Sequence, residues 1–153
     1  MPAVWRRLRS FFSRSANLAS SPRIAIVALI VDDWERRVLT GVSAREPWDV
    51  LLVESCDDAC AVSNQRTAPV VVFDRDWPDT EWRSAVQKLA SSPHRPCVIL
   101  MSRVADDYLS DELFHQGGYE VLPKPLRAED VIRVVKLALS YWNSAAQAAL
   151  ARR

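Results

Sequence analysis

The chain of 153 residues is long enough for one domain with a substantial core, and its formal net charge of +1 gives no reason to expect nucleic acid as a partner. The longest apolar run, 24–31, is too short to cross a bilayer, and the N-terminus lacks the apolar segment of a signal peptide. Cys56, Cys60 and Cys97 form neither an even disulfide framework nor a CxxC pair. These features predict a cytoplasmic protein with free thiols.

Residues 1–22 differ from the rest of the chain because they carry four arginines and no acid. Apolar side chains recur there at helical spacing, namely Val4, Trp5, Leu8, Phe11 and Phe12. This pattern favours a basic amphipathic or disordered N-terminal extension, with contact to an anionic membrane as the weaker alternative. Ser20–Pro22 marks the boundary to a domain predicted at 23–142.

Apolar runs and helical patterns alternate from residue 23 onward. Strands are predicted at 24–31, 48–53, 69–73, 96–101 and 119–122. Helices are predicted at 32–44, 57–63, 80–90, 106–116 and 128–142, the second of them short and the last extending into the alanine-rich tail 143–153. This alternation predicts an α/β fold, a flavodoxin-like (βα)5 doubly wound parallel sheet with the strand order 2-1-3-4-5.

Polar residues follow the ends of these strands. The apolar run Val70–Phe73 leads directly into Asp74, and Pro78 helps to fix the turn that comes next. The other strand ends are followed by Asp32 and Asp33 after the first strand, Ser102 after the fourth and Lys124 after the fifth. Ligand chemistry in open α/β sheets occurs at the carboxyl ends of the strands. Alone, Asp32 and Asp33 would equally suit the start of a helix, so the set of residues carries the interpretation.

The residue types at this edge suit phosphoryl chemistry. In the order 2-1-3-4-5 the first and third strands are neighbours, so Asp32, Asp33 and Asp74 should meet. Crowded carboxylates require a cation, and hard oxygen ligands with open positions suit Mg²⁺. Lys124 would offset the charge of a phosphoryl group, Ser102 would donate a hydrogen bond to it, and an aspartate can accept it covalently.

The chain resembles the receiver domain of bacterial two-component response regulators over roughly residues 23–142. The matching motifs are Ile30-Val31-Asp32-Asp33, then Asp74-Arg75-Asp76-Trp77-Pro78 as a version of Asp-x-x-Met-Pro, then Met101-Ser102, then Lys124-Pro125. Each motif alone is weakly specific. Four of them, in the family's order and on the expected elements, make the resemblance fairly specific.

The resemblance implies that Asp74 accepts a phosphoryl group from the phosphohistidine of a histidine kinase or phosphotransfer protein, and that the domain is not a turnover enzyme. It implies a Mg²⁺ site formed by Asp32, Asp33, Asp74 and the backbone carbonyl of Asp76. Ser102 and Lys124 would bind the phosphoryl oxygens. Phosphorylation would then alter the face made by the fourth helix, fifth strand and fifth helix, through which a downstream protein would bind. The Lys124–Pro125 bond is expected to be cis, as is common in this family.

Three positions depart from the family pattern. Arg103 follows Ser102 where a small residue is usual, so it would either crowd the phosphoryl group or add charge to it. Val121 replaces the usual aromatic switch residue, and Tyr119, predicted on the same strand face, is a weak candidate to substitute for it. Trp82 stands where glycine is common. These changes bear on the switching mechanism more than on the fold.

Two other functions compete with the phosphoacceptor receiver. One is a degenerate receiver that serves as an interaction module without phosphorylation, suggested by Arg103, Val121 and Trp82. The other, less favoured, is a phosphohydrolase resembling the haloacid dehalogenase family, in which Asp74-Arg75-Asp76 would supply the strand-end Asp-x-Asp. The acidic pair of this chain precedes that motif, which is the receiver order.

Overall fold

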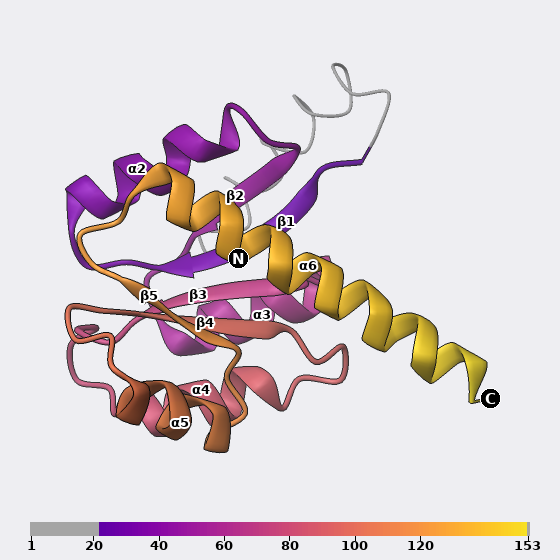
Figure 1. The fold of residues 1–153 in the computed structure, drawn as a ribbon. Coiled ribbons are helices and arrows are strands. Elements are labelled where there is room, and N and C mark those ends of the chain that lie inside the picture. Colours follow the sequence, from indigo (N-terminus) through magenta and orange to yellow (C-terminus); the bar gives the residue numbers. More distant parts are fainter. Residues whose placement is uncertain (1–21, 153) are drawn as a thin grey trace.

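The computed structural model describes residues 22–152 and shows a five-stranded parallel sheet. The strands are β1 (Ile24–Leu29), β2 (Trp48–Leu52), β3 (Val70–Asp74), β4 (Cys97–Ser102) and β5 (Glu120–Pro123). Their spatial order is β2-β1-β3-β4-β5, which confirms the predicted doubly wound topology (Figure 1). The order reverses between β1 and β3, and this reversal is where such sheets place their ligands.

Within residues 22–152, five helices cover the two faces of the sheet. They are α2 (Asp33–Ser43), α3 (Cys56–Arg66), α4 (Trp82–Ala90), α5 (Asp107–His115) and α6 (Ala128–Ala151). Helices α2 and α6 lie on one face, and α3, α4 and α5 lie on the other (Figure 1). Each helix that lies between two strands returns the chain to the amino edge of the sheet, so every strand runs in the same direction.

The strands have apolar side chains on both sides because helices bury both faces. Along β3, Val71 and Phe73 belong to the core beneath α3, α4 and α5, whereas Val70 and Val72 belong to the core beneath α2 and α6. All four are fully buried. Burying each such side chain contributes about 1.5–3 kcal/mol, so this short strand is a major source of stability.

Some element boundaries differ from the sequence prediction. Strand β1 ends at Leu29 rather than Val31, since its pairing with β3 stops at Leu29 opposite Phe73. Helix α3 is longer than predicted: Ser55 caps its first turn and Thr67, in a left-handed conformation, ends it. Helix α6 continues to Ala151, as predicted, and extends beyond the sheet (Figure 1). The helical pattern predicted in residues 1–22 lies, except for Pro22, outside the described residues.

A buried charge cluster closes the amino edge of the sheet. The carboxylate of Asp49 on β2 accepts a hydrogen bond from Arg23 Nε at 2.8 Å and forms an ion pair with Arg66 Nη2 at 3.2 Å. Arg23 also donates to three backbone carbonyls between the end of α2 and the start of β2, those of Ser43, Glu46 and Trp48. The cluster therefore joins the start of β1 to β2 and the end of α3.

None of the described helices in residues 22–152 is long and apolar enough to cross a membrane.

Candidate functional site

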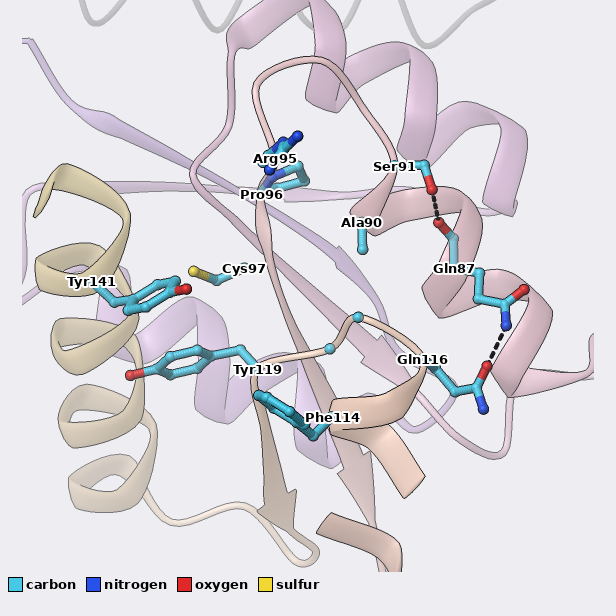
Figure 2. A pocket seen from close by; sticks show the side chains of 12 residues that line it. Gln87, Ala90, Ser91, Arg95, Pro96, Cys97, Phe114, Gln116, Tyr119 and Tyr141 are labelled. Carbon is cyan, nitrogen blue, oxygen red and sulfur yellow. Dashed lines mark hydrogen bonds between the residues drawn. The ribbon is translucent and has the colours of Figure 1, made fainter. Parts of the chain in front are cut away.

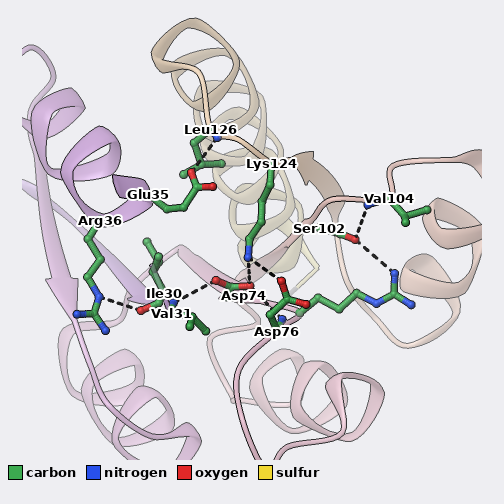
Figure 3. A network of polar contacts seen from close by, with 11 residues as sticks. Ile30, Val31, Glu35, Arg36, Asp74, Asp76, Ser102, Val104, Lys124 and Leu126 are labelled. Atoms are coloured by element: carbon green, nitrogen blue, oxygen red, sulfur yellow. Dashed lines mark hydrogen bonds and ion pairs between the residues drawn. The ribbon is translucent and has the colours of Figure 1, made fainter. Parts of the chain in front are cut away.

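The sheet register brings three of the predicted site residues to the carboxyl edge. Asp74, the last residue of β3, lies opposite Met101, and the next residue of β4 is Ser102. Ser102 in turn lies opposite Pro123, which precedes Lys124. Figure 3 shows these side chains gathered beside the loop that follows β1. The predicted proximity of Asp74, Ser102 and Lys124 is thus a direct consequence of strand order and register.

Asp74 is fully buried and its carboxylate is held by three donors. Lys124 Nζ lies 2.5 Å from Oδ1, and the backbone N–H of Asp76 donates to the same oxygen at 3.0 Å. The backbone N–H of Val31 donates to Oδ2 at 3.1 Å (Figure 3). A buried carboxylate is costly unless paired, and here one ammonium and two N–H groups satisfy it.

Lys124 bridges two acids at this edge. Its side chain is only 5% exposed, and Nζ also lies 3.1 Å from Asp76 Oδ2. Burial lowers the pKa of the Lys124 amine, but hydrogen bonds and charge from Asp74 and Asp76 outweigh burial and raise this pKa above its ordinary value. The Lys124–Pro125 peptide bond is cis, as predicted. The lysine is therefore held in its charged form next to the candidate phosphoacceptor.

Ser102 is buried, and its hydroxyl oxygen accepts two hydrogen bonds. One comes from the backbone N–H of Val104 at 3.2 Å and the other from Arg75 Nη1 at 3.3 Å. The Arg75 guanidinium also lies 5.8 Å from the centre of the Trp82 ring. The sequence analysis assigned no functional role to Arg75. Its signal was present, however, since Arg75 directly follows Asp74 at the end of a buried strand.

The acidic pair Asp32 and Asp33 stands at the start of α2, where both residues are exposed. Asp32 occupies the N-cap position without a side-chain capping bond, and Asp33 pairs with Arg36 at 3.3 Å. Within residues 22–152, no three His, Cys, Asp or Glu side chains are grouped closely enough to hold a metal ion. The Val31–Asp74 hydrogen bond nevertheless places the backbone just before Asp32 against the Asp74 carboxylate.

The positions that depart from the family pattern fall in different environments. Arg103 is exposed, and it makes no side-chain hydrogen bond or ion pair within the described part of the chain. Val121 is buried beneath α3, α4 and α5. Trp82 is buried in the same core, with Arg83 stacked 4.6 Å from its ring centre. The arginine that contacts Ser102 is therefore Arg75, and not Arg103.

The predicted position of Tyr119 on the same face as Val121 is wrong. Tyr119 precedes β5 and packs against the opposite core, the one beneath α2 and α6. Its ring lies 5.5 Å from that of Tyr141 on α6, and Figure 2 shows the two rings beside each other at the edge of a surface hollow. Tyr119 therefore cannot replace an aromatic switch at Val121.

Glu35 is a buried acid that the sequence prediction did not single out. Its Oε2 accepts a hydrogen bond from the backbone N–H of Leu126 at 2.8 Å (Figure 3). This bond ties α2 to the loop that carries Lys124. Glu35 shares one helix face with the buried Leu39 and Val42, so its helical spacing was a signal that it points inward.

Comparisons with known proteins come from structure alone, since no protein-family model and no curated protein matches the sequence. The signal receiver domain of an HD domain-containing protein from Pseudomonas fluorescens Pf-5 superposes with a TM-score of 0.72 at 16% identity, over 86% of this chain and 98% of that one. A two-component response regulator from Clostridium difficile gives 0.68 at 18% identity, over 77% and 97% of the two chains.

A longer protein, NtrX from Brucella abortus, also matches. The TM-score is 0.70 at 17% identity, over 83% of this chain but only 29% of NtrX. The matched fold is thus one part of the longer NtrX chain. The sheet order, the helices on its two faces and these superpositions agree, and the chain has the fold of the receiver domains of response regulators.

Proposed function

We propose that this domain is a phosphoacceptor receiver in a phosphorelay and that Asp74 is the residue phosphorylated. The observation that carries the proposal is the fully buried Asp74 carboxylate at the end of β3, held 2.5 Å from Lys124 Nζ and one strand away from the Ser102 hydroxyl. Carboxylate, ammonium and hydroxyl are the groups needed to accept a phosphoryl group and to bind its oxygens.

The reaction would transfer a phosphoryl group from a phosphohistidine to Asp74. A carboxylate oxygen of Asp74 attacks phosphorus, the P–N bond breaks, and the imidazole leaves with the electron pair and takes up a proton. Lys124 is already charged and in contact with the attacking carboxylate. Its ammonium group can therefore stabilise the negative charge of the phosphoryl oxygens as the phosphoryl group is transferred. The Ser102 hydroxyl hydrogen is available to donate, because both of its observed bonds are accepted by the oxygen.

The donor atoms fit Mg²⁺ in type. The carboxylates of Asp32, Asp33 and Asp74 and the backbone carbonyl of Asp76 are hard oxygen ligands from the adjacent ends of β1 and β3. In the structure Lys124 bridges Asp74 and Asp76, so these acids would share their charge with both the lysine and the metal. Bound Mg²⁺ would supply positive charge to the phosphoryl oxygens.

The outgoing signal would reach a protein partner through the face formed by α5, β5 and α6. This face carries large exposed side chains, including Tyr108 and Phe114 on α5 and Leu137 and Tyr141 on α6. Phe114 and Tyr141, together with Tyr119, line the hollow in Figure 2. Exposed aromatic side chains are enriched at protein interfaces, which favours this face as the binding surface.

The test is intact-mass measurement after incubation with acetyl phosphate and Mg²⁺. Wild-type protein should gain the mass of one phosphoryl group, and Asp74→Asn should gain none. Asp79→Asn is the matched control, since Asp79 is an exposed acid in the same loop. If the wild type gains no phosphoryl group from acetyl phosphate or from a phosphohistidine donor, the proposal is wrong.

A second candidate function is an interaction module that needs no phosphorylation. The specific observations that favour it are the exposed, separate placement of Asp32 and Asp33 and the aliphatic, buried Val121. Failure of both phosphoryl donors would make this function the better supported one. The phosphohydrolase hypothesis is less favoured, because the sheet order and the superposed structures agree with a receiver.

A further inference from the structure

Arg75 holds a positive charge beside the candidate phosphoacceptor without a carboxylate partner. Among residues 22–152, no Asp or Glu forms an ion pair with it, whereas Arg83 and Arg36 each pair with acids. Arg75 is partly buried, and its backbone N–H donates to Met101 at 3.0 Å. A partly buried guanidinium usually satisfies itself with an anion, so its present contacts leave binding capacity unused.

The two contacts of Arg75 fix its position without consuming that capacity. Nη1 donates to the Ser102 hydroxyl at 3.3 Å, which uses one of the five N–H groups of the guanidinium. The Trp82 ring, 5.8 Å away and buried in the core, provides a flat surface for the guanidinium. The arginine is thus held against the same hydroxyl that is proposed to donate to the phosphoryl group.

We infer that Arg75 is a phosphoryl-binding residue: when Asp74 is phosphorylated, the Arg75 guanidinium binds a phosphoryl oxygen next to Ser102. The inference rests on the proposed function and adds a residue to that site. Lys124 approaches Asp74 from the end of β5, and Arg75 approaches from the Ser102 side. Together they place one cation on each side of a dianionic group, and the planar guanidinium can offer two parallel N–H bonds to it.

The test is equilibrium binding of beryllofluoride with Mg²⁺, which adds to an aspartate carboxylate as a stable mimic of a phosphoryl group and is followed by fluorine NMR. Arg75→Gln should weaken this binding about tenfold, the effect of losing one charge-assisted hydrogen bond. Arg75→Lys keeps the charge but loses the planar guanidinium with its parallel N–H groups. Its affinity for beryllofluoride should fall between those of the wild type and Arg75→Gln. Arg83→Gln is the matched control, because Arg83 stacks on the same ring but pairs with Glu81 and Glu112.

The outcomes separate the two hypotheses. Wild-type binding with equal affinities for wild type, Arg75→Gln and Arg83→Gln would overturn the role of Arg75 and leave the proposed function standing. Absence of beryllofluoride binding in wild type, with no phosphoryl adduct in the mass measurement, would overturn both. Urea unfolding of each variant checks folding. If Arg75→Gln does not fold, Arg75→Lys decides, since unchanged affinity in that variant would contradict bidentate binding.

Discussion

Two buried aspartates occupy opposite edges of the same sheet and are neutralised in different ways. Asp49, near the amino edge, pairs with two guanidinium groups, Arg23 and Arg66. Asp74, at the carboxyl edge, contacts one ammonium group and two backbone N–H groups. Both carboxylates are less than a tenth exposed, so burial does not distinguish them.

The difference lies in how free the cations are to change partners. Arg23 is tied to three backbone carbonyls as well as to Asp49, so its position is part of the fold. Lys124 is a compact charge on a flexible stem, and Asp76, which is half exposed, already shares it. A buried carboxylate whose cation is shared with a half-exposed acid can exchange that cation for a ligand, whereas a carboxylate between guanidiniums that also bind the backbone serves stability.

The largest effect is expected from Asp49→Asn. Removing this charge takes one carboxylate partner from the partly buried Arg66 and from Arg23, whose side chain is 36% exposed, and breaking a buried ion pair costs about 3–5 kcal/mol. Urea unfolding should show this loss. Asp74→Asn is the comparison variant and should cost less, because Lys124 keeps its contact with Asp76. Equal losses in the two variants would break the distinction between structural and reactive acids.

Lys124→Met should have the next largest effect. It removes the only Lys or Arg that pairs with Asp74 among the described residues, but the two backbone N–H bonds remain. We expect a loss of about 2 kcal/mol in the free energy of unfolding, below the full cost of an orphaned buried charge. A variant as stable as wild type would show that the backbone donors alone satisfy Asp74.

The contribution of Lys124 to the free energy of unfolding should change with pH in the alkaline range. The pKa of its amine in the folded protein is raised above the ordinary 10.5, so its stabilisation is fully present below pH 10.5 and is lost as pH rises through the folded pKa. The gap in unfolding free energy between wild type and Lys124→Met should therefore be constant from pH 7 to 9 and shrink above pH 10.5. A gap that widens at high pH would contradict this sign.

Glu35→Ala should reduce the free energy of unfolding less than the substitutions at Asp49, Asp74 and Lys124. It leaves the buried N–H of Leu126 without its acceptor, at a cost of about 1–2 kcal/mol. Glu129→Ala, at an exposed position on α6, is the control and should change stability by less than about 0.5 kcal/mol. Indistinguishable unfolding curves for the two variants would show that the bond to Leu126 does not hold the Lys124 loop in place.

The sequence predicted the fold well because parallel strands buried on both faces appear as continuous apolar runs. It predicted Asp74, Ser102 and Lys124 as neighbours because each follows such a run, and the strand order brings the ends of β3, β4 and β5 side by side. It missed the length of α3, whose residues show no clear apolar face. It misplaced Tyr119 because side-chain alternation holds only inside a strand, and β5 begins one residue later.

The roles of Arg75 and Glu35 were harder to predict for a different reason. Each depends on where one long side chain points, and that direction is decided by partners distant in sequence. Arg75 reaches Ser102, 27 residues away, and Glu35 reaches Leu126, 91 residues away. Local patterns indicate that such side chains face inward but do not identify what they meet.

Helix α6 has a geometric consequence of its own. Its 24 residues rise by about 36 Å, and the final turns project beyond the sheet on which its first half packs (Figure 1). The buried residues Val131 and Val135 anchor the first half of the helix in the core, so a tilt of the helix about these residues would displace its far end the most. A tilt too small to disturb core packing would be magnified at Ala151, so the far end of this helix would be the most sensitive place for a distance probe.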